Sequence, residues 1–166
     1  MSQDFYLGNP NLKKVGTEIQ FTKEQIQEYL RCKEDPVYFA MNYIKIISLD
    51  EGIVPFKMWD FQQELIESFH ENRFNIAKLP RQTGKSTTCV SYLLHYILFN
   101  DNVNVGILAN KLSTARDLLG RLQLAYEQLP LWLQQGIVVY NKGSMELENG
   151  SKILAASTSA SAVRGM

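Results

Sequence analysis

The sequence is poor in cysteine, balanced in charge and free of long hydrophobic runs. Its two cysteines, Cys32 and Cys89, lie far apart without the spacing of metal ligands, so we expect reduced thiols and a cytosolic compartment. Seventeen basic and 17 acidic residues give a formal net charge of +0, so no overall basic field favours nucleic acid, although a local patch could still bind it. No hydrophobic run is as long as a membrane span, and residues 1–4 do not start a signal peptide. We therefore expect no membrane association.

The length and composition are those of one globular domain. The 166 residues, of which 45% are hydrophobic and 20% charged, are enough to bury a core. Residues 1–20 are polar and contain a Gly-Asn-Pro-Asn stretch, which predicts an irregular N-terminal arm. Residues 21–166 are then expected to belong to a single domain, which we interpret below as the N-terminal part of a larger one.

The first half of this domain is expected to be helical. Thr22 and Gln25 have the spacing of a capping box for a helix that ends near Cys32. Pro36 is suited to the first turn of the next helix. We expect an irregular or extended connection over residues 46–57, followed by an amphipathic helix over residues 58–72.

Strands and helices alternate in the second half. The expected elements are a buried strand at 74–79, a helix at 87–99, a strand at 103–109 and a helix at 113–128. This alternation predicts an α/β fold with a parallel sheet and flanking helices. Short strands are expected at 137–140, 145–147 and 152–156, the last two joined as a β-hairpin at Asn149-Gly150.

The most informative segment is 80–87, Pro-Arg-Gln-Thr-Gly-Lys-Ser-Thr, between an expected strand and an expected helix. This layout is typical of a P-loop (Walker A), in which backbone N–H groups surround the phosphates of a nucleotide. Lys85 would contact the β- and γ-phosphates, and the Ser86 hydroxyl would bind Mg²⁺. Gly-Lys-Ser is also common in ordinary surface turns, and Leu79 stands where the usual pattern has its first glycine. The nucleotide-binding candidates in this segment are Arg81, Gln82, Thr83, Gly84, Lys85, Ser86 and Thr87.

Arg81 has a second candidate role, and two residues outside the loop are further candidates for contacts with ATP. Arg81 lies in the loop, where its guanidinium could reach the γ-phosphate and act in catalysis. Phe61 and Gln62 precede the loop by about twenty residues, and such an aromatic-Gln pair can stack on adenine and pair with its edge. The alternative is that Phe61 belongs to the core while Gln62 is exposed on an amphipathic helix.

An acidic partner for Mg²⁺ is missing from the expected place. The segment 46–51 imitates a Walker B strand ending in Asp50-Glu51, but it precedes the loop, whereas the Mg²⁺-binding acid follows it. We therefore interpret it as unrelated to Mg²⁺. Beyond residue 109 no hydrophobic run ends in Asp-Glu, so we expect the chain to be cut before Walker B and to hydrolyse ATP poorly by itself.

The order of the motifs resembles one known family. The chain is similar to the N-terminal ATPase domain of the large terminase subunit of T-even-type tailed bacteriophages, over roughly residues 20–166. The segments that carry the resemblance are 60–62 (Asp-Phe-Gln), 80–87, 106–111 (Gly-Ile-Leu-Ala-Asn-Lys), 141–144 (Asn-Lys-Gly-Ser), 148–151 (Glu-Asn-Gly-Ser) and 162–165 (Ala-Val-Arg-Gly).

The resemblance implies a RecA-like ATPase core and a motor function. The family couples ATP hydrolysis to translocation of double-stranded DNA into the capsid during virion assembly, with a portal protein and a small terminase subunit as partners. It implies ATP and Mg²⁺ as ligands, a homo-oligomeric ring on the capsid and a place in the host cell cytoplasm. Arg164 is implied as a catalytic arginine that stabilises the γ-phosphate in the same subunit or a neighbouring one. Where family members often have arginine before Asp60, this chain has Trp59.

Two other functions remain open on sequence grounds. A P-loop kinase acting on a small acceptor would be expected to have the first glycine and a lid over the acceptor. A nucleotide-binding module without enzymatic activity would need only the loop and the helix.

Overall fold

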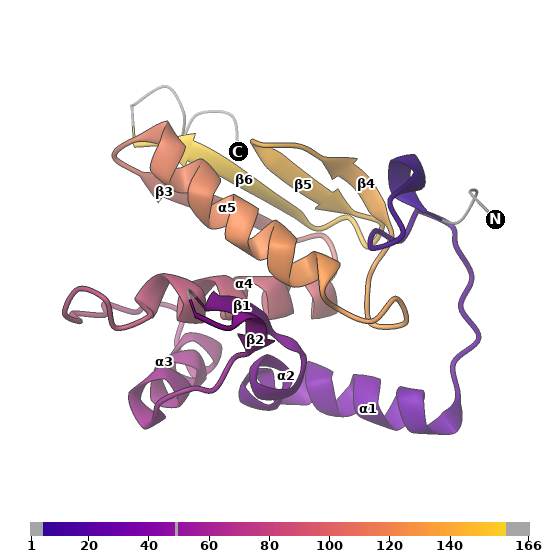
Figure 1. Cartoon of the computed structure of the whole chain (residues 1–166), viewed down its shortest axis with the longest axis horizontal. Helices are drawn as coiled ribbons and strands as arrows, with labels where there is room; N and C mark the ends of the chain where they lie inside the picture. Colours follow the sequence, from indigo (N-terminus) through magenta and orange to yellow (C-terminus); the bar gives the residue numbers. More distant parts are fainter. Residues whose placement is uncertain (1–4, 49, 159–166) are drawn as a thin grey trace.

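The computed structural model describes residues 5–48 and 50–158 as an α/β fold. Figure 1 shows a mixed sheet on one side, a group of helices on the other, and two long helices between them. The first half contains η1 (Tyr6–Gly8), α1 (Lys23–Glu34), α2 (Pro36–Tyr43), β1 (Lys45–Ser48), β2 (Gly52–Pro55) and α3 (Asp60–Glu71). The second half contains α4 (Lys85–Phe99), β3 (Asn104–Ala109), α5 (Leu112–Glu127), β4 (Ile137–Tyr140), β5 (Ser144–Leu147) and β6 (Lys152–Ser157).

The main sheet is mixed, whereas the sequence predicted a parallel sheet with a β-hairpin near its C-terminal end. Its strand order is β3-β6-β5-β4, with β3 and β6 parallel and the other two pairs antiparallel. Strands β5 and β6 form the hairpin predicted at Asn149-Gly150, and Gly150 adopts a φ of 80° there. The α/β class, the flanking helices and this hairpin are confirmed. Because β4 and β5 return as a hairpin, only β3 and β6 need the long crossover of a parallel pair.

The segment 74–79, predicted to be a buried strand, is neither buried nor in a strand. Phe74 is 82% exposed and Ile76 is 100% exposed. A strand needs a neighbour for its backbone N–H and C=O groups. Among the described residues the four strands of the main sheet all follow α4, and none of them pairs with this segment. The segment therefore reaches the loop without regular secondary structure, and its hydrophobic composition alone was misleading.

The connection 46–57, predicted to be irregular or extended, contains the hairpin β1–β2. Cross-strand pairs join Ile46 to Val54 and Ile47 to Ile53, and these β-branched side chains favour a strand. Asp50 and Glu51 lie in its turn, and Gly52 follows with a φ of 74°. The hairpin also forms one wall of the cleft described below.

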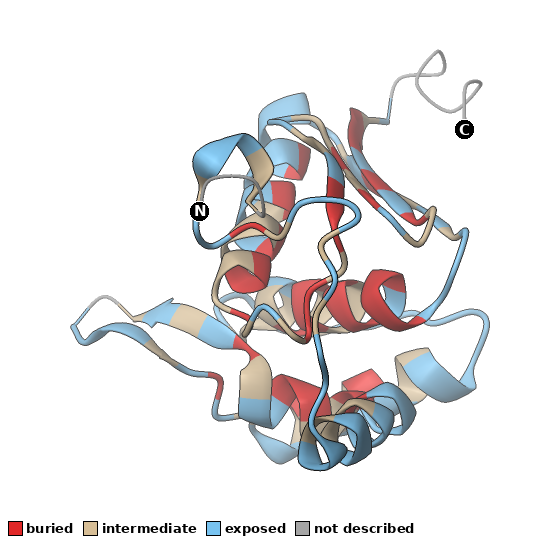
Figure 2. Cartoon of the chain, turned by 90° about the vertical axis from the view of Figure 1, so that its right-hand side faces the viewer, coloured by how far each residue is buried: buried red, intermediate tan, exposed pale blue. Residues whose placement is uncertain are grey.

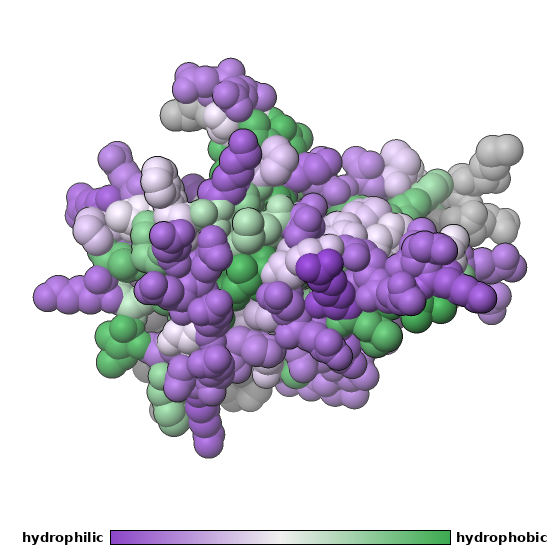
Figure 3. All heavy atoms as spheres, turned by 90° about the horizontal axis from the view of Figure 1, so that it is seen from below, coloured by the Kyte–Doolittle hydropathy of each residue, from purple (hydrophilic) through white to green (hydrophobic). Residues whose placement is uncertain are grey.

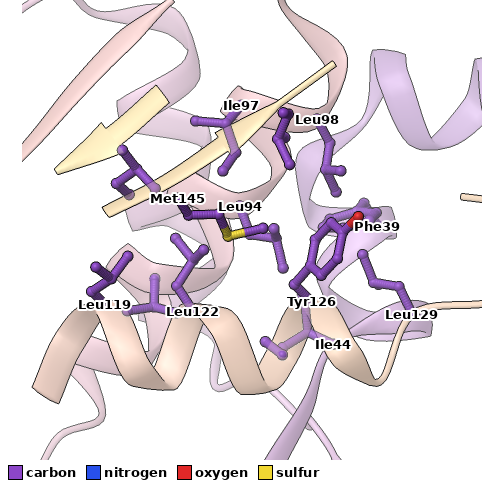
Figure 4. Close-up of a cluster of buried hydrophobic side chains, with 14 of the residues drawn as sticks. Phe39, Ile44, Leu94, Ile97, Leu98, Leu119, Leu122, Tyr126, Leu129 and Met145 are labelled. Atoms are coloured by element: carbon purple, nitrogen blue, oxygen red, sulfur yellow. The ribbon is translucent and has the colours of Figure 1, made fainter. Parts of the chain in front are cut away.

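Helix α4 forms the centre of the core. It packs against α5 on one side and against α2 and α3 on the other, while α5 in turn covers β3 and β6. Figure 2 shows it buried along most of its length, and Figure 4 shows Leu94, Ile97 and Leu98 facing side chains from α5 and β5. Burying a leucine or isoleucine contributes roughly 1.5–3 kcal/mol per side chain. The outer face of the α1–α3 layer is mainly hydrophilic, with hydrophobic side chains in scattered patches (Figure 3).

Helices α1 and α2 begin as the sequence predicted. The Thr22 hydroxyl accepts a bond from the Gln25 N–H at 3.2 Å, and the Gln25 amide oxygen accepts one from the Thr22 N–H at 3.0 Å. Asp35 caps α2 by accepting the Tyr38 N–H at 2.8 Å. Each bond satisfies a donor that a helix start would otherwise leave unpaired. No helix among the described residues is long and hydrophobic enough to cross a membrane.

The N-terminal arm is held on the main domain by Glu148. Its carboxylate accepts the Gly136 N–H at 2.7 Å, the Gly16 N–H at 3.2 Å and the Lys13 ammonium at 3.4 Å. Partial burial opposes ionisation of Glu148, but these three donors together outweigh it and lower the pKa of the carboxyl. Leu12 is buried beside this contact, so the arm adds to the core.

His95 makes the stability of the fold sensitive to acid. Its side chain is 2% exposed, with Nε2 at 2.9 Å from the Cys32 carbonyl oxygen and Nδ1 without a partner among the described residues. Burial lowers the pKa of His95 to about 4, and the nearby His70 adds to this effect. Below the usual histidine pKa the unfolded chain binds a proton that the folded chain excludes, so stability falls as the pH falls.

We predict that the free energy of unfolding falls by on the order of 2 kcal/mol between pH 7 and pH 5 because of His95. Denaturant titrations of the wild type and of His95→Gln measure it, and His70→Gln, at the other histidine of the chain, is the matched control. The fall in the free energy of unfolding with pH should be strongly reduced in His95→Gln and only slightly reduced in His70→Gln, because His70 makes a smaller contribution to the His95 pKa than burial does. An equal slope in all three proteins contradicts this role for His95.

Candidate functional site

The junction between the loop 80–84 and α4 is the centre of the candidate site. Gly84 precedes the helix with a φ of 73°, and Gln82 adopts a φ of 63° that residues other than glycine seldom take. The Thr83 hydroxyl donates to the Pro80 carbonyl at 3.0 Å and closes the turn. These features keep the loop tight and turn the chain directly into the first turn of α4.

The start of α4 presents backbone donors to any anion. The first helical hydrogen bond runs from the Thr88 N–H to the Gly84 carbonyl at 3.0 Å, so the N–H groups of Lys85, Ser86 and Thr87 have no acceptor within the helix. Gly84 has no side chain with which to cap them. The positive end of the helix dipole adds to their attraction for a negative group. The junction can therefore bind phosphate oxygens.

Lys85 is folded back on the loop. Its ammonium donates to the Pro80 carbonyl at 2.7 Å and lies 3.5 Å from the Leu79 carbonyl. A phosphate at the start of α4 would offer the ammonium an anionic acceptor in place of these neutral ones, and such a charge-assisted bond is roughly twice as strong. Arg81 and Ser86 are exposed at the same junction.

Gln62 joins the start of α3 to the loop. It is 3% exposed, its Oε1 accepts the Trp59 N–H at 3.0 Å, and its Nε2 donates to the Thr83 carbonyl at 3.1 Å. From the sequence we expected this amide to pair with adenine or, alternatively, to be exposed to solvent. In the structure it is buried and bonds backbone atoms. We call this pair of bonds the Gln62 clasp.

A cleft of about 500 Å³ opens beside the clasp. Loop and helix residues form one side of it, and the aromatic segment before α3 and the β1–β2 hairpin form the other. Its lining residues are Ile46, Phe56, Lys57, Trp59, Phe61, Gln62, Gln82, Thr83, Gly84 and Thr87. Phe61, Gln62 and four loop or helix residues predicted from the sequence thus meet in one cleft, beside the junction that carries Arg81, Lys85 and Ser86. Arg164 lies outside the described residues.

Sequence reasoning missed part of this cleft. Trp59 was noted only as a replacement for arginine, and Phe56, Lys57 and Ile46 were assigned to an irregular or extended connection without a role in the site. The signal that could have found them is the cluster of aromatic residues at Phe56, Trp59 and Phe61, just before a helix that leads to the loop.

The site offers few ligands to a metal ion. Nowhere in residues 5–48 and 50–158 do three His, Cys, Asp or Glu side chains gather to hold one. The Ser86 hydroxyl is the one predicted Mg²⁺ ligand in the described part of the chain. Mg²⁺ commonly keeps several waters and binds substrate phosphates, so a single protein oxygen is compatible with an ion that arrives with a nucleotide.

A side chain at position 84 would displace the amide of the Gln62 clasp. A Cβ there would stand 2.5 Å from Gln62 Nε2, and the positive φ adds strain for any other residue. Gly52 has a similar φ of 74° with nothing within 4 Å of the Cβ position. The substitution Gly52→Ala therefore measures the cost of the positive φ alone. Gln62→Ala removes the clash but leaves the strain.

We predict that Gly84→Ala lowers the free energy of unfolding by more than Gly52→Ala, whose cost should be about 1 kcal/mol. In the Gln62→Ala background the cost of Gly84→Ala should fall to that of Gly52→Ala. Chemical denaturation of the single and double variants measures these differences. If Gly84→Ala costs the same with and without Gln62, the clasp does not constrain the loop.

The comparison with known families adds no assignment to this geometry. No family model matches the sequence. The chemical interpretation of the site therefore depends on the loop, the start of α4, the Gln62 clasp and the cleft.

Proposed function

We propose that this chain is the ATP-binding part of a viral DNA-packaging motor, the large terminase subunit, which couples ATP hydrolysis to translocation of double-stranded DNA into the capsid. The observation that carries the proposal is the junction between the loop 80–84 and α4. There a lysine and a serine form the first turn of a buried helix whose first N–H groups have no acceptor within the helix. A glycine-lysine-serine sequence on an ordinary surface turn would lack that helix start.

In this proposal, different residues of the chain contact different parts of the nucleotide. The N–H groups of Lys85, Ser86 and Thr87 bind phosphate oxygens, and the Lys85 ammonium leaves the Pro80 carbonyl to contact the β- and γ-phosphates. The Ser86 hydroxyl binds Mg²⁺, which when present neutralises charge on the phosphates. Arg81, exposed in the loop, approaches the γ-phosphate as charge develops on it.

The finer parts of the proposal come from the sequence motifs. A P-loop of the RecA-like type has a strand before the loop that belongs to the main sheet. Because residues 74–79 make no such pairing among the described residues, the proposal depends on the loop and helix rather than on the sheet. Double-stranded DNA, the portal protein, the small terminase subunit and the ring on the capsid are proposed from the terminase resemblance, as are the host cytoplasm and the catalytic role of Arg164.

Nucleotide affinity is the first test of the proposal. We predict that Lys85→Ala weakens binding of MgATP and MgADP by at least tenfold, because the variant loses a charge-assisted contact worth on the order of 2 kcal/mol. Isothermal titration calorimetry measures the change. Lys78→Ala removes a nearby exposed lysine and is the control for general electrostatic attraction. Equal losses in both variants, or none in Lys85→Ala, contradict a P-loop.

Turnover is the second test. We predict that the 166-residue chain binds MgATP but releases phosphate far more slowly than an ATPase of the proposed class, because no Asp-Glu pair follows its loop to orient water. A phosphate-release assay with the wild type measures the rate, and Asp50→Asn with Glu51→Gln tests the remaining acidic pair. Rapid hydrolysis that these two substitutions abolish would show that Asp50-Glu51 had been wrongly set aside.

A further inference from the structure

The most exposed large aromatic residue of the cleft is Trp59. Its side chain lines the cleft and is 71% exposed, whereas its backbone N–H is fixed by the bond to Gln62 Oε1. Phe61 and the buried Phe56 line the same cleft. An indole left open to water at the rim of a cleft gains free energy when a flat apolar ligand covers it.

Gln62 is poorly placed to read a base. Both ends of its amide are bonded to backbone atoms of Trp59 and Thr83, and almost none of the side chain reaches solvent. To pair with a base edge it would have to give up the clasp and release the loop. The contact with the base must then come from a neighbour that is free to make it.

We propose that the indole of Trp59 stacks on the purine base of the bound nucleotide, and that Gln62 is a positioning residue that holds the phosphate loop. The proposal rests on the proposed function, because it assigns the base to the same nucleotide whose phosphates bind at the start of α4. The cleft supports this occupant because Gln82, Thr83 and Gly84 of the loop line it together with Trp59. A base in the cleft is therefore continuous with phosphates at the loop.

Stacking and edge recognition predict different specificities. A ring face attracts any purine, so stacking on Trp59 should favour nucleotides over pyrophosphate while discriminating weakly between ADP and GDP. An amide that pairs with one edge would instead favour adenine strongly, because the wrong base would leave buried groups unpaired. The comparison of ADP, GDP and pyrophosphate thus separates the two roles.

The chain offers a direct spectroscopic test, because its only other tryptophan is Trp132. That residue lines a different cleft, next to α1, and its ring packs against Tyr43 at a centroid distance of 5.9 Å. In Trp132→Phe the emission comes from Trp59 alone. We expect MgADP and MgGDP to quench it, magnesium pyrophosphate to leave it nearly unchanged, and the matched variant Trp59→Phe to lose the response.

Calorimetry on the same proteins measures how much Trp59 and Gln62 contribute to the affinity for each ligand. Trp59→Ala should weaken MgADP and MgGDP by about tenfold or more and leave pyrophosphate affinity unchanged, while Trp59→Phe should keep most of the nucleotide affinity. Gln62→Ala should weaken pyrophosphate and MgADP by the same factor, because it releases the loop from the clasp.

Four outcomes would overturn the proposal. Equal MgADP affinity in the wild type and Trp59→Ala removes Trp59 from the site. A loss of adenine preference in Gln62→Ala, with pyrophosphate affinity unchanged, returns base recognition to Gln62. A wild type that binds neither MgADP nor pyrophosphate overturns the proposed function and this inference with it, whereas pyrophosphate binding that is equal to MgADP binding overturns the inference alone.

Discussion

The burial of α4 is the constraint on which the rest of the structure depends. Helices α2, α3 and α5 enclose it, so its axis and the position of its first turn are fixed by packing. A helix that is buried along its length still has unpaired N–H groups at its start, and here they face the loop rather than a capping side chain. Loss of packing in the middle of α4 would therefore disturb the candidate site at its end.

The Gln62 clasp passes this rigidity to the loop. Gln62 belongs to α3, which packs on α4, and its bond to the Thr83 carbonyl ties the loop to both helices. Its amide approaches Gly84 so closely that a side chain at that position would displace it. One buried amide thus sets the entry of the loop into α4 and, through the Trp59 backbone, one wall of the cleft.

The sequence predicted the parts of the fold that local signals determine. The capping box at Thr22, the hairpin at Asn149-Gly150 and the turn at Gly84 each require a particular residue type, and all three occur. The strand predicted at 74–79 was wrong because a hydrophobic run does not show whether a neighbouring strand is present to pair with it. The bonds of Gln62 could not be predicted for a related reason, since the carbonyl to which its amide donates lies 21 residues along the chain and is brought near by the packing of α3 on α4.

The central claim is that the start of α4 binds phosphate, and backbone amide chemical shifts measured during a titration with magnesium pyrophosphate test it most directly. The account predicts large shifts at Gly84, Lys85 and Ser86 at concentrations that leave the start of α5 (residues 112–114) unchanged. Helix α5 is of similar length and also begins without a side-chain cap, so it controls for anion attraction by any helix start. Equal shifts at both helices, or none at either, would contradict the account.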